Sequence, residues 1–125
     1  MANLFENALG DTLAAAKSAA GVSVTYTSAV DAVDLVAVPG QTTFDVADGD
    51  GRVTELTTRD WIIAANDLVL AGLHATPSPG DTIEHLDGST VRTFRVLEPG
   101  GEQCYRLGPH GQTMRIHTKE TTPGT

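Results

Sequence analysis

The stretch "DWIIAANDLVLAG", Asp60–Gly72, decides the fold more than any other part of the chain. It opens with three large apolar residues in a row, Trp61–Ile63, which is typical of a buried β-strand. Asn66-Asp67 then interrupts the pattern, an apolar turn Leu68–Leu70 follows, and "PSPGDTI", Pro77–Ile83, leads into another strand. The stretch therefore predicts a buried strand, a short apolar turn and then a Pro-Gly-Asp turn into another strand.

Apolar residues alternate with polar ones on both sides of this stretch. In "VSVTYTSA", Val22, Val24 and Tyr26 alternate with serine and threonine, which predicts a half-buried strand. Pro39-Gly40 predicts a strand end, and Asp87-Gly88 is the strongest hairpin signal in the chain. The other strands are expected over 33–38, 42–46, 52–65 (with a bend or bulge near Arg59-Asp60), 82–86, 90–97, 103–107 and 113–119.

The N-terminal region has a helical period. Phe5, Leu9 and Leu13 recur at the spacing of one helix face within residues 2–20, and Gly21 is a suitable helix end. This narrow apolar stripe can pack either on the chain's own sheet or on a neighbouring subunit. We therefore count Phe5, Leu9 and Leu13 among the candidate interaction residues.

Together these patterns predict a mainly β fold, a small antiparallel β-barrel or sandwich with one N-terminal α-helix. The expected organisation is a helix over residues 1–21, a β-barrel domain over 22–120 and a polar tail over 121–125. The 125 residues fit one domain, and no long helices alternate with the strands, so a parallel sheet is not expected.

Composition excludes several classes of function. The net charge is −8, which argues against tight binding of a phosphate backbone but not against DNA passing by without being gripped. No stretch is apolar enough for a membrane helix, and no secretory signal is expected. The lone cysteine, Cys104, cannot form an internal disulfide, so an intracellular folding compartment is the simplest interpretation.

No residue set supports catalysis, a cofactor or a metal. Cys104, His110 and His117 would supply at most three metal ligands, and the histidines lack the helical pairing of a zinc enzyme. Asp48 and Asp50 begin like a calcium loop, but the rest of that motif is missing and a plain turn is expected. We therefore expect no catalytic, cofactor-binding or metal-binding residues.

The basic residues gather in the last third of the chain. Arg115, His117 and Lys119 alternate with Met114, Ile116 and Thr118, so one face of the last strand is cationic, whereas most acidic residues come earlier. Such a face can simply be solvated. It can also meet an acidic patch on an identical neighbour, which suits head-to-tail association around a ring.

Over more than half its length, from about Thr54 to Glu120, the chain resembles bacteriophage head-tail joining proteins, also called head-completion, stopper or neck proteins. The resemblance rests on Trp61-Ile62-Ile63 leading to Asp67-Leu68, the Pro79-Gly80-Asp81 turn, "VLEPGGE" followed by Cys104-Tyr105-Arg106, and "RIHTK" at Arg115–Lys119. Tyr105 stands where relatives carry tryptophan, which keeps an aromatic residue there.

The resemblance implies a structural virion protein rather than an enzyme. It implies a homo-oligomeric ring, six-fold or twelve-fold, in the neck of the virion and assembled in the host cytoplasm. The ring would join the portal or adaptor protein to the tail terminator or tail tube protein and help to seal the packaged DNA, which would pass without sequence-specific binding. No membrane is involved.

By position, the loop "AGLHATPSP" and the turn after it are expected to touch a partner. His74, Pro77 and Asp81 are its candidate interaction residues, and Arg115 and Lys119 are those of the cationic strand. Two alternatives remain open within the virion: a capsid decoration (cement) protein, or a tail terminator, which would carry a second long helix. A third is a small ligand-binding β-barrel, which would need an apolar cavity.

Overall fold

The computed structural model describes residues 20–47 and 49–121, and these residues are mainly β-strand. Most of the predicted helix over 1–21, including Phe5, Leu9 and Leu13, and most of the tail over 121–125 lie outside the described residues. Among the described residues no α-helix is assigned as an element. The strands are β1 (Val22–Thr27), β2 (Ala32–Ala47), β3 (Val53–Ala64), β4 (Val69–Leu70), β5 (Leu73–His74), β6 (Thr82–Asp87), β7 (Thr90–Val96), β8 (Tyr105–Leu107) and β9 (Thr113–Glu120). The 3₁₀ turns are η1 (Ala65–Asp67), η2 (Pro99–Gly101) and η3 (Pro109–Gly111).

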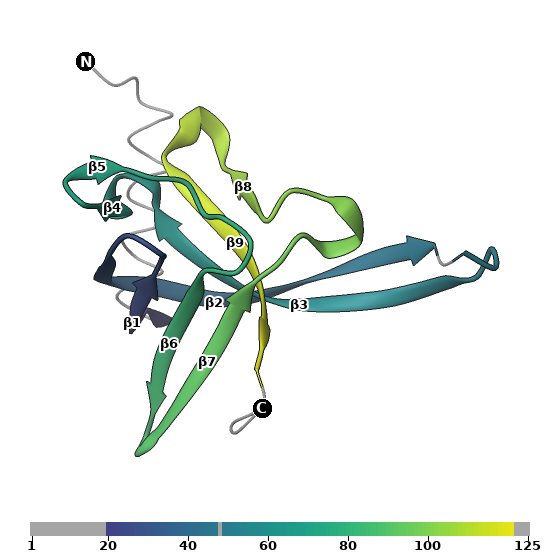
Figure 1. Ribbon diagram of the computed structural model, residues 1–125, viewed down its shortest axis with the longest axis horizontal. Helices are drawn as coiled ribbons and strands as arrows, with labels where there is room; N and C mark the ends of the chain where they lie inside the picture. The colour runs from purple at the N-terminus through teal and green to yellow at the C-terminus, as the bar shows by residue number, and fades with distance from the viewer. Residues whose placement is uncertain (1–19, 48, 122–125) are drawn as a thin grey trace.

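Six antiparallel strands close into a barrel (Figure 1). They follow the order β3-β2-β1-β6-β7-β9, and β9 pairs with β3 to complete the circle. β8 pairs with the part of β9 that β7 does not reach, so β9 is shared by three strands. The barrel is therefore the form taken by the expected barrel or sandwich.

Alternation along each strand fills the barrel with apolar side chains. On β3, Trp61 and Ile63 point inward and are fully buried, and Met114 and Ile116 meet them from β9. Each such side chain contributes about 1.5–3 kcal/mol by leaving water. The remaining core residues come from the other strands and from the loops between strands: Val24, Tyr26, Leu35, Ala37, Leu68, Leu70, Ile83, Phe94, Val96 and Cys104. The interior of this barrel is therefore filled by the chain's own side chains.

The prediction that Pro39-Gly40 ends a strand is wrong, because β2 continues through them to Ala47. Its pairing with β1 ends at Ala37, opposite Val22, while its pairing with β3 runs on to Ala47. Beyond Ala37 one edge of β2 therefore has no strand partner among residues 20–47 and 49–121, and a strand with a free edge can carry a proline.

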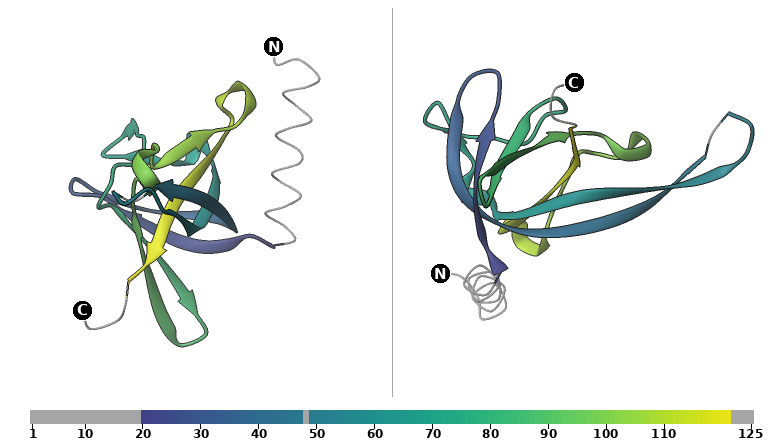
Figure 2. Two further views of the ribbon diagram at one scale, coloured as in Figure 1. Left: turned by 90° about the vertical axis from the view of Figure 1, so that its right-hand side faces the viewer. Right: turned by 90° about the horizontal axis from the view of Figure 1, so that it is seen from below.

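β2 and β3 consequently extend past the barrel as a two-stranded ribbon, here called the arm (residues 41–47 and 53–58). It projects away from the barrel, on the side opposite β4 and β5 in Figure 1, and Figure 2 shows the same projection in a second direction. The expected bulge near Arg59-Asp60 is also wrong, since the β2–β3 register runs from Val38 opposite Ile62 to Ala47 opposite Val53 without a break.

The opening stretch of the sequence has the structure that its pattern predicts. Trp61 lies in a strand with a partner on each side, because β3 pairs with both β2 and β9. η1 follows directly, and Leu68 after it is fully buried, so the turn formed by η1 and Leu68–Leu70 covers one end of the barrel. Within residues 20–47 and 49–121, no helix is long and apolar enough to span a lipid bilayer.

Candidate functional site

A shallow apolar groove lies at the barrel end that carries β4 and β5. Its two most exposed large side chains are Val30, in the turn between β1 and β2, and Leu73 of β5, with relative exposures of 76% and 72%. We call this groove the barrel-end surface, which is lined by Ser28, Ala29, Val30, Leu70, Leu73, His74, Ala75, Thr76, Ser78, Pro79 and Asp81. Apolar side chains exposed together on rigid turns are typical of a surface that contacts another protein.

Hydrogen bonds hold the two turns of this surface against each other. The side chain of Asp31 accepts a hydrogen bond of 2.8 Å from the backbone amide of Ala71, which lies in the left-handed region at φ 52°. Hydrogen bonds from the amides of Ala71 and Ala32 lower the pKa of Asp31. Ser28 closes the first turn, since its hydroxyl accepts from the amide of Val30 at 3.2 Å. Val30 and Leu73 are thus presented in a fixed arrangement before any partner binds.

Asp81 supports the same surface from below. Its carboxylate accepts a hydrogen bond from the hydroxyl of Tyr26 and another, at 3.1 Å, from the backbone amide of Ser78. Burial, together with the hydrogen bond to Asp81, raises the pKa of the Tyr26 hydroxyl, which therefore stays protonated and donates. Asp81 thus accepts a hydrogen bond from a backbone amide of its own turn, as aspartate commonly does.

A second cluster is a buried polar network on the outer face of β3 and β9. Asp60 is fully buried and accepts from Thr58 Oγ1 at 2.7 Å, from Arg115 at 2.8 Å and from the hydroxyl of Thr42. His117 Nδ1 lies 2.9 Å from Oδ1, the oxygen that also accepts from Thr58, while Arg115 and Thr42 donate to Oδ2. The segment after β7 lies beside β9 here, since the backbone amide of Leu97 donates to the carbonyl oxygen of His117 at 3.2 Å, and Gly100 in that segment approaches Val46. Gly100 has φ 59°, which favours glycine there.

The hydrogen-bond donors around Asp60 keep its carboxylate ionised. Burial raises the pKa of Asp60, but hydrogen bonds from His117, Thr42, Thr58 and Arg115 outweigh it, and the pKa ends well below its usual range. An ionised carboxylate can only accept, so His117 Nδ1 carries the proton that it donates to Asp60. The network ties β2, β3 and β9 together at the seam that closes the barrel.

An aspartate–histidine pair occurs in hydrolases, but there it serves a nucleophile that substrate can reach. His117 is 1% exposed and its ring packs edge-on against Phe44, with centroids 5.1 Å apart. Arg115 shares the carboxylate with it. These contacts assign the pair to closing the sheet rather than to chemistry on a substrate.

Cys104, His110 and His117 do not come together as a metal site. Cys104 is buried, and its thiol donates to the carbonyl oxygen of Pro77 at 3.4 Å. Burial raises the pKa of that thiol, which makes it a poor nucleophile. Across residues 20–47 and 49–121 no three His, Cys, Asp or Glu side chains converge in a way that could hold a metal ion.

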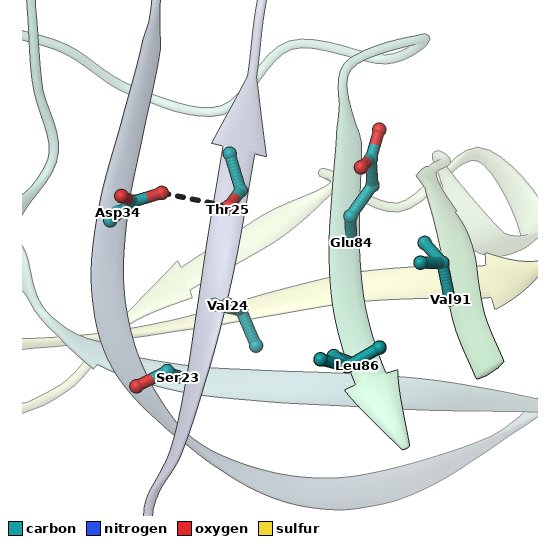
Figure 3. Close-up of a pocket in the computed structure, with 7 residues that line it drawn as sticks. All are labelled: Ser23, Val24, Thr25, Asp34, Glu84, Leu86 and Val91. Carbon is teal, nitrogen blue, oxygen red and sulfur yellow. Dashed lines mark hydrogen bonds between the residues drawn. The ribbon is translucent and has the colours of Figure 1, made fainter. Parts of the chain in front are cut away.

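An outer groove runs over β1, β6 and β7 (Figure 3). In it the Thr25 hydroxyl donates to Asp34 at 2.7 Å, while Leu86 and Val91 lie directly opposite each other on β6 and β7 and are more than half exposed. Glu84 is the other carboxylate that lines it. One hydroxyl–carboxylate pair beside aliphatic side chains offers a contact surface and no reactive group.

The predicted interaction residues fall in different places. His74 is exposed on the barrel-end surface, Asp81 lines that surface while holding Tyr26, and Pro77 is buried beneath it. Arg115 is half-buried because it pairs with Asp60, whereas Lys119 is exposed near the end of β9. His117, expected beside them on a cationic face, is buried, so that face is not continuous.

Sequence reasoning missed Asp60 and the exposed Val30 and Leu73. A signal for Asp60 was present, because alternation puts it on the face of its strand opposite Trp61, and puts Arg115 and His117 opposite Ile116 in the same way. A carboxylate and two cationic groups on the outer faces of two strands indicate a pair when the strands are neighbours. Which strands are neighbours was the missing fact.

The family comparison agrees with this arrangement of a packed barrel and contact surfaces. A family model described as Phage head-tail joining protein matches residues 2–125, nearly the whole chain. No curated protein matches it. The match confirms the resemblance carried by the stretches from Thr54 to Glu120, and the chain belongs to the phage head-tail joining protein family.

Proposed function

We propose that copies of this chain form a ring, six-fold or twelve-fold, that connects the portal or its adaptor to the tail terminator or tail tube protein and helps to seal the packaged DNA in the head. Membership of the family makes the chain a structural component of the virion's head-tail junction, which interacts with head and tail components and is not an enzyme. The family match over residues 2–125 is the observation that carries the proposal.

The barrel-end surface supports a docking role. Val30 and Leu73 are exposed on turns that Asp31 and Ser28 hold in place, so little freedom is lost when a partner covers them. We assign this surface to one of the two neighbours along the neck, head or tail.

The charge of the chain supports free passage of DNA. At −8 it repels phosphate groups, and a channel built from such subunits lets DNA slide rather than stick. Sealing is then a matter of steric closure by loops or by neighbouring proteins, not of attraction.

The test is a phage that lacks the protein, complemented with variants. Without it we expect DNA-filled heads that lack tails and lose DNA, and with it about six or twelve copies in each particle. Hundreds of copies would indicate a decoration protein instead, and tails of uncontrolled length in its absence would indicate a terminator.

A matched pair of variants separates docking from folding. Leu73→Glu places a charge on the barrel-end surface and should leave heads and tails unjoined, whereas Leu86→Glu alters a similarly exposed leucine in the outer groove and should join them normally. Equal joining by the two variants would rule out the barrel-end surface.

A further inference from the structure

Three directly opposed pairs of residues in the sheet carry like charge. Asp45 faces Glu55 on the arm, Arg95 faces Lys119 between β7 and β9, and Arg106 faces Arg115 between β8 and β9. Like charges in this position destabilise a sheet unless something else compensates them.

The third pair is compensated within the chain. Arg115 forms an ion pair with Asp60 at 2.8 Å, and the guanidinium of Arg106 lies over the ring of Phe44. Elsewhere on β7, Arg92 is similarly compensated, with two nitrogens each 2.7 Å from the carboxylate of Glu120.

The first two pairs are not compensated. Asp45, Glu55, Arg95 and Lys119 are all exposed, and none of the four forms a hydrogen bond through its side chain or an ion pair with a residue in the described part of the chain. The chain therefore holds two carboxylates side by side and two cations side by side, each pair with side-chain origins about 5 Å apart.

The two pairs are complementary in sign and spacing, and the chain's shape lets them meet between copies. The arm projects from the barrel, and its strand segment 41–47 is about 20 Å long at the usual rise per residue. On one face of the arm Phe44 packs against His117 and Val46 meets Gly100, whereas Asp45 and Glu55 are exposed on the other face. Where the arm leaves the barrel, a groove is lined by Gln41, Thr57, Thr58, Arg59, Phe94, Lys119 and Glu120, and the Glu120 carboxylate is already paired with Arg92. Gln41, Thr57 and Thr58 belong to the arm itself. We call the barrel side of the groove, which is Arg59, Phe94, Lys119 and Glu120 together with Arg95 opposite Lys119, the arm seat.

We propose that the arm of one copy lies in the arm seat of the next copy, so that Asp45 and Glu55 pair with Arg95 and Lys119. This inference rests on the proposed ring and assigns its subunit contact to named residues. The contact is heterologous, since the arm and the seat are different parts of the surface, and such contacts link copies head to tail. The charges also steer each arm to a seat and not to another arm.

The occupant is a second copy, and a partner of another sequence is the competing outcome. The acidic pair on the arm and the cationic pair on the seat are opposite in charge, so two copies of the chain can neutralise both pairs without another protein. The isolated two-stranded ribbon is also marginal in water, and a seat supplies it with a covering surface.

Charge reversal with a built-in rescue tests the contact. In one variant Asp45→Lys and Glu55→Lys are combined, in a second Arg95→Glu and Lys119→Glu, and a third carries all four changes. Full-length chains are studied alone over a concentration series by analytical ultracentrifugation, and on DNA-filled heads that lack the protein by electron microscopy. Circular dichroism checks that each variant is folded.

We expect each two-residue variant to associate roughly 100-fold more weakly than the parent, because several kcal/mol of repulsion replaces attraction. The four-residue variant should assemble like the parent, since its pairs are inverted but again opposite in sign. Glu84→Lys with Glu102→Lys, two exposed carboxylates outside the arm, makes the same change in net charge and should have no effect.

The outcomes of these experiments distinguish failure of the arm–seat contact from failure of the proposed ring. Two-residue variants that assemble like the parent, or a folded four-residue variant that does not, overturn the contact and leave the ring standing. A two-fold dimer that responds to the reversals as expected supports the contact and overturns the ring. A parent chain that stays monomeric both alone and on heads overturns both.

Discussion

The barrel wall and the arm are built from the same two strands, yet they are opposite environments. Within the wall, β3 buries Trp61 and Ile63 on its inner face, and Asp60 on its outer face is buried as well, within the polar network of β2, β3 and β9. On the arm, the same strand leaves Val53 67% exposed and holds Glu55 beside Asp45. Regular alternation and unbroken pairing thus determine which residues share a face, and what covers a face determines whether it is core or surface.

The two regions also contribute differently to the free energy of unfolding. Stability comes from the wall, where each residue has many neighbours, and the arm contributes little until something covers it. Substitutions along one strand should therefore range from strongly destabilising to nearly neutral, and four predictions test this difference between wall and arm.

The largest effect is expected in the wall. Trp61→Ala leaves a cavity among Ile63, Phe94 and Ile116 and should lower the free energy of unfolding by about 3–5 kcal/mol. Val53→Ala on the same strand should change it by less than about 0.5 kcal/mol. Urea denaturation of both variants measures the contrast, and similar losses would contradict it.

The polar seam should come next. Asp60→Asn keeps the shape of the side chain but removes the charge that faces Arg115 and His117, at a cost of about 3 kcal/mol. The loss should also depend on pH. Because the folded-state pKa of Asp60 is lowered, its ionised form stabilises the protein above about pH 4, and that contribution disappears as the pH falls below the unfolded value.

The variant should consequently show a shallower loss of stability than the parent between about pH 4 and pH 2. Asp31 and Glu120, whose pKa values are also lowered, are unchanged in both chains and cancel in the difference. Parallel curves for parent and variant would show that Asp60 does not titrate in the folded chain as described.

A smaller loss is expected at the barrel end. Tyr26→Phe removes the hydroxyl that donates to Asp81 and should cost about 1.5 kcal/mol, the usual value for a hydrogen bond to a charged group. Thermal unfolding measures this loss. Thr43→Val, which removes an exposed hydroxyl of the arm 3.1 Å from that of Thr57, is the matched control and should be nearly neutral.

The smallest effect should have the opposite sign. Glu55→Lys converts the like-charged pair with Asp45 into an opposite-charged one and should stabilise the isolated chain by about 0.2–1 kcal/mol. The same change should weaken assembly, because the lysine then faces Lys119 of the next copy. Chemical denaturation of the monomer at low salt measures the gain, and a destabilised monomer would contradict the repulsion.

Much of the wall could be predicted from sequence, because alternation of apolar and polar residues is a local property. Two other local signals were also sufficient, since the apolar run Trp61–Ile63 predicts its strand and the dipeptide Asp87-Gly88 predicts its turn. Pro39-Gly40 misled the prediction because a proline is excluded from a strand only where its missing N–H is needed, and that depends on where β1 begins.

The candidate surfaces could be predicted less well, since they depend on which distant strands meet. Asp60 and His117 are 57 residues apart, and nothing near either one indicates the other. The charged pair Asp45 and Glu55 could be read as turn-flanking residues, and only the register shows that they face each other. Which distant residues meet depends on which strands pair, and the residue pattern along a single strand does not reveal that.

β9 closes the barrel, and among the strands of the described residues it is the last to be made. Until the ribosome has delivered Thr113–Glu120, the edge of β3 has no partner and Asp60 has no histidine beside it. Closure by contacts so distant in sequence is slow, and the waiting edge can pair with the wrong chain. A nascent chain is therefore most vulnerable to aggregation just before β9 emerges, and a chaperone that holds the open edge would raise the yield of folded protein.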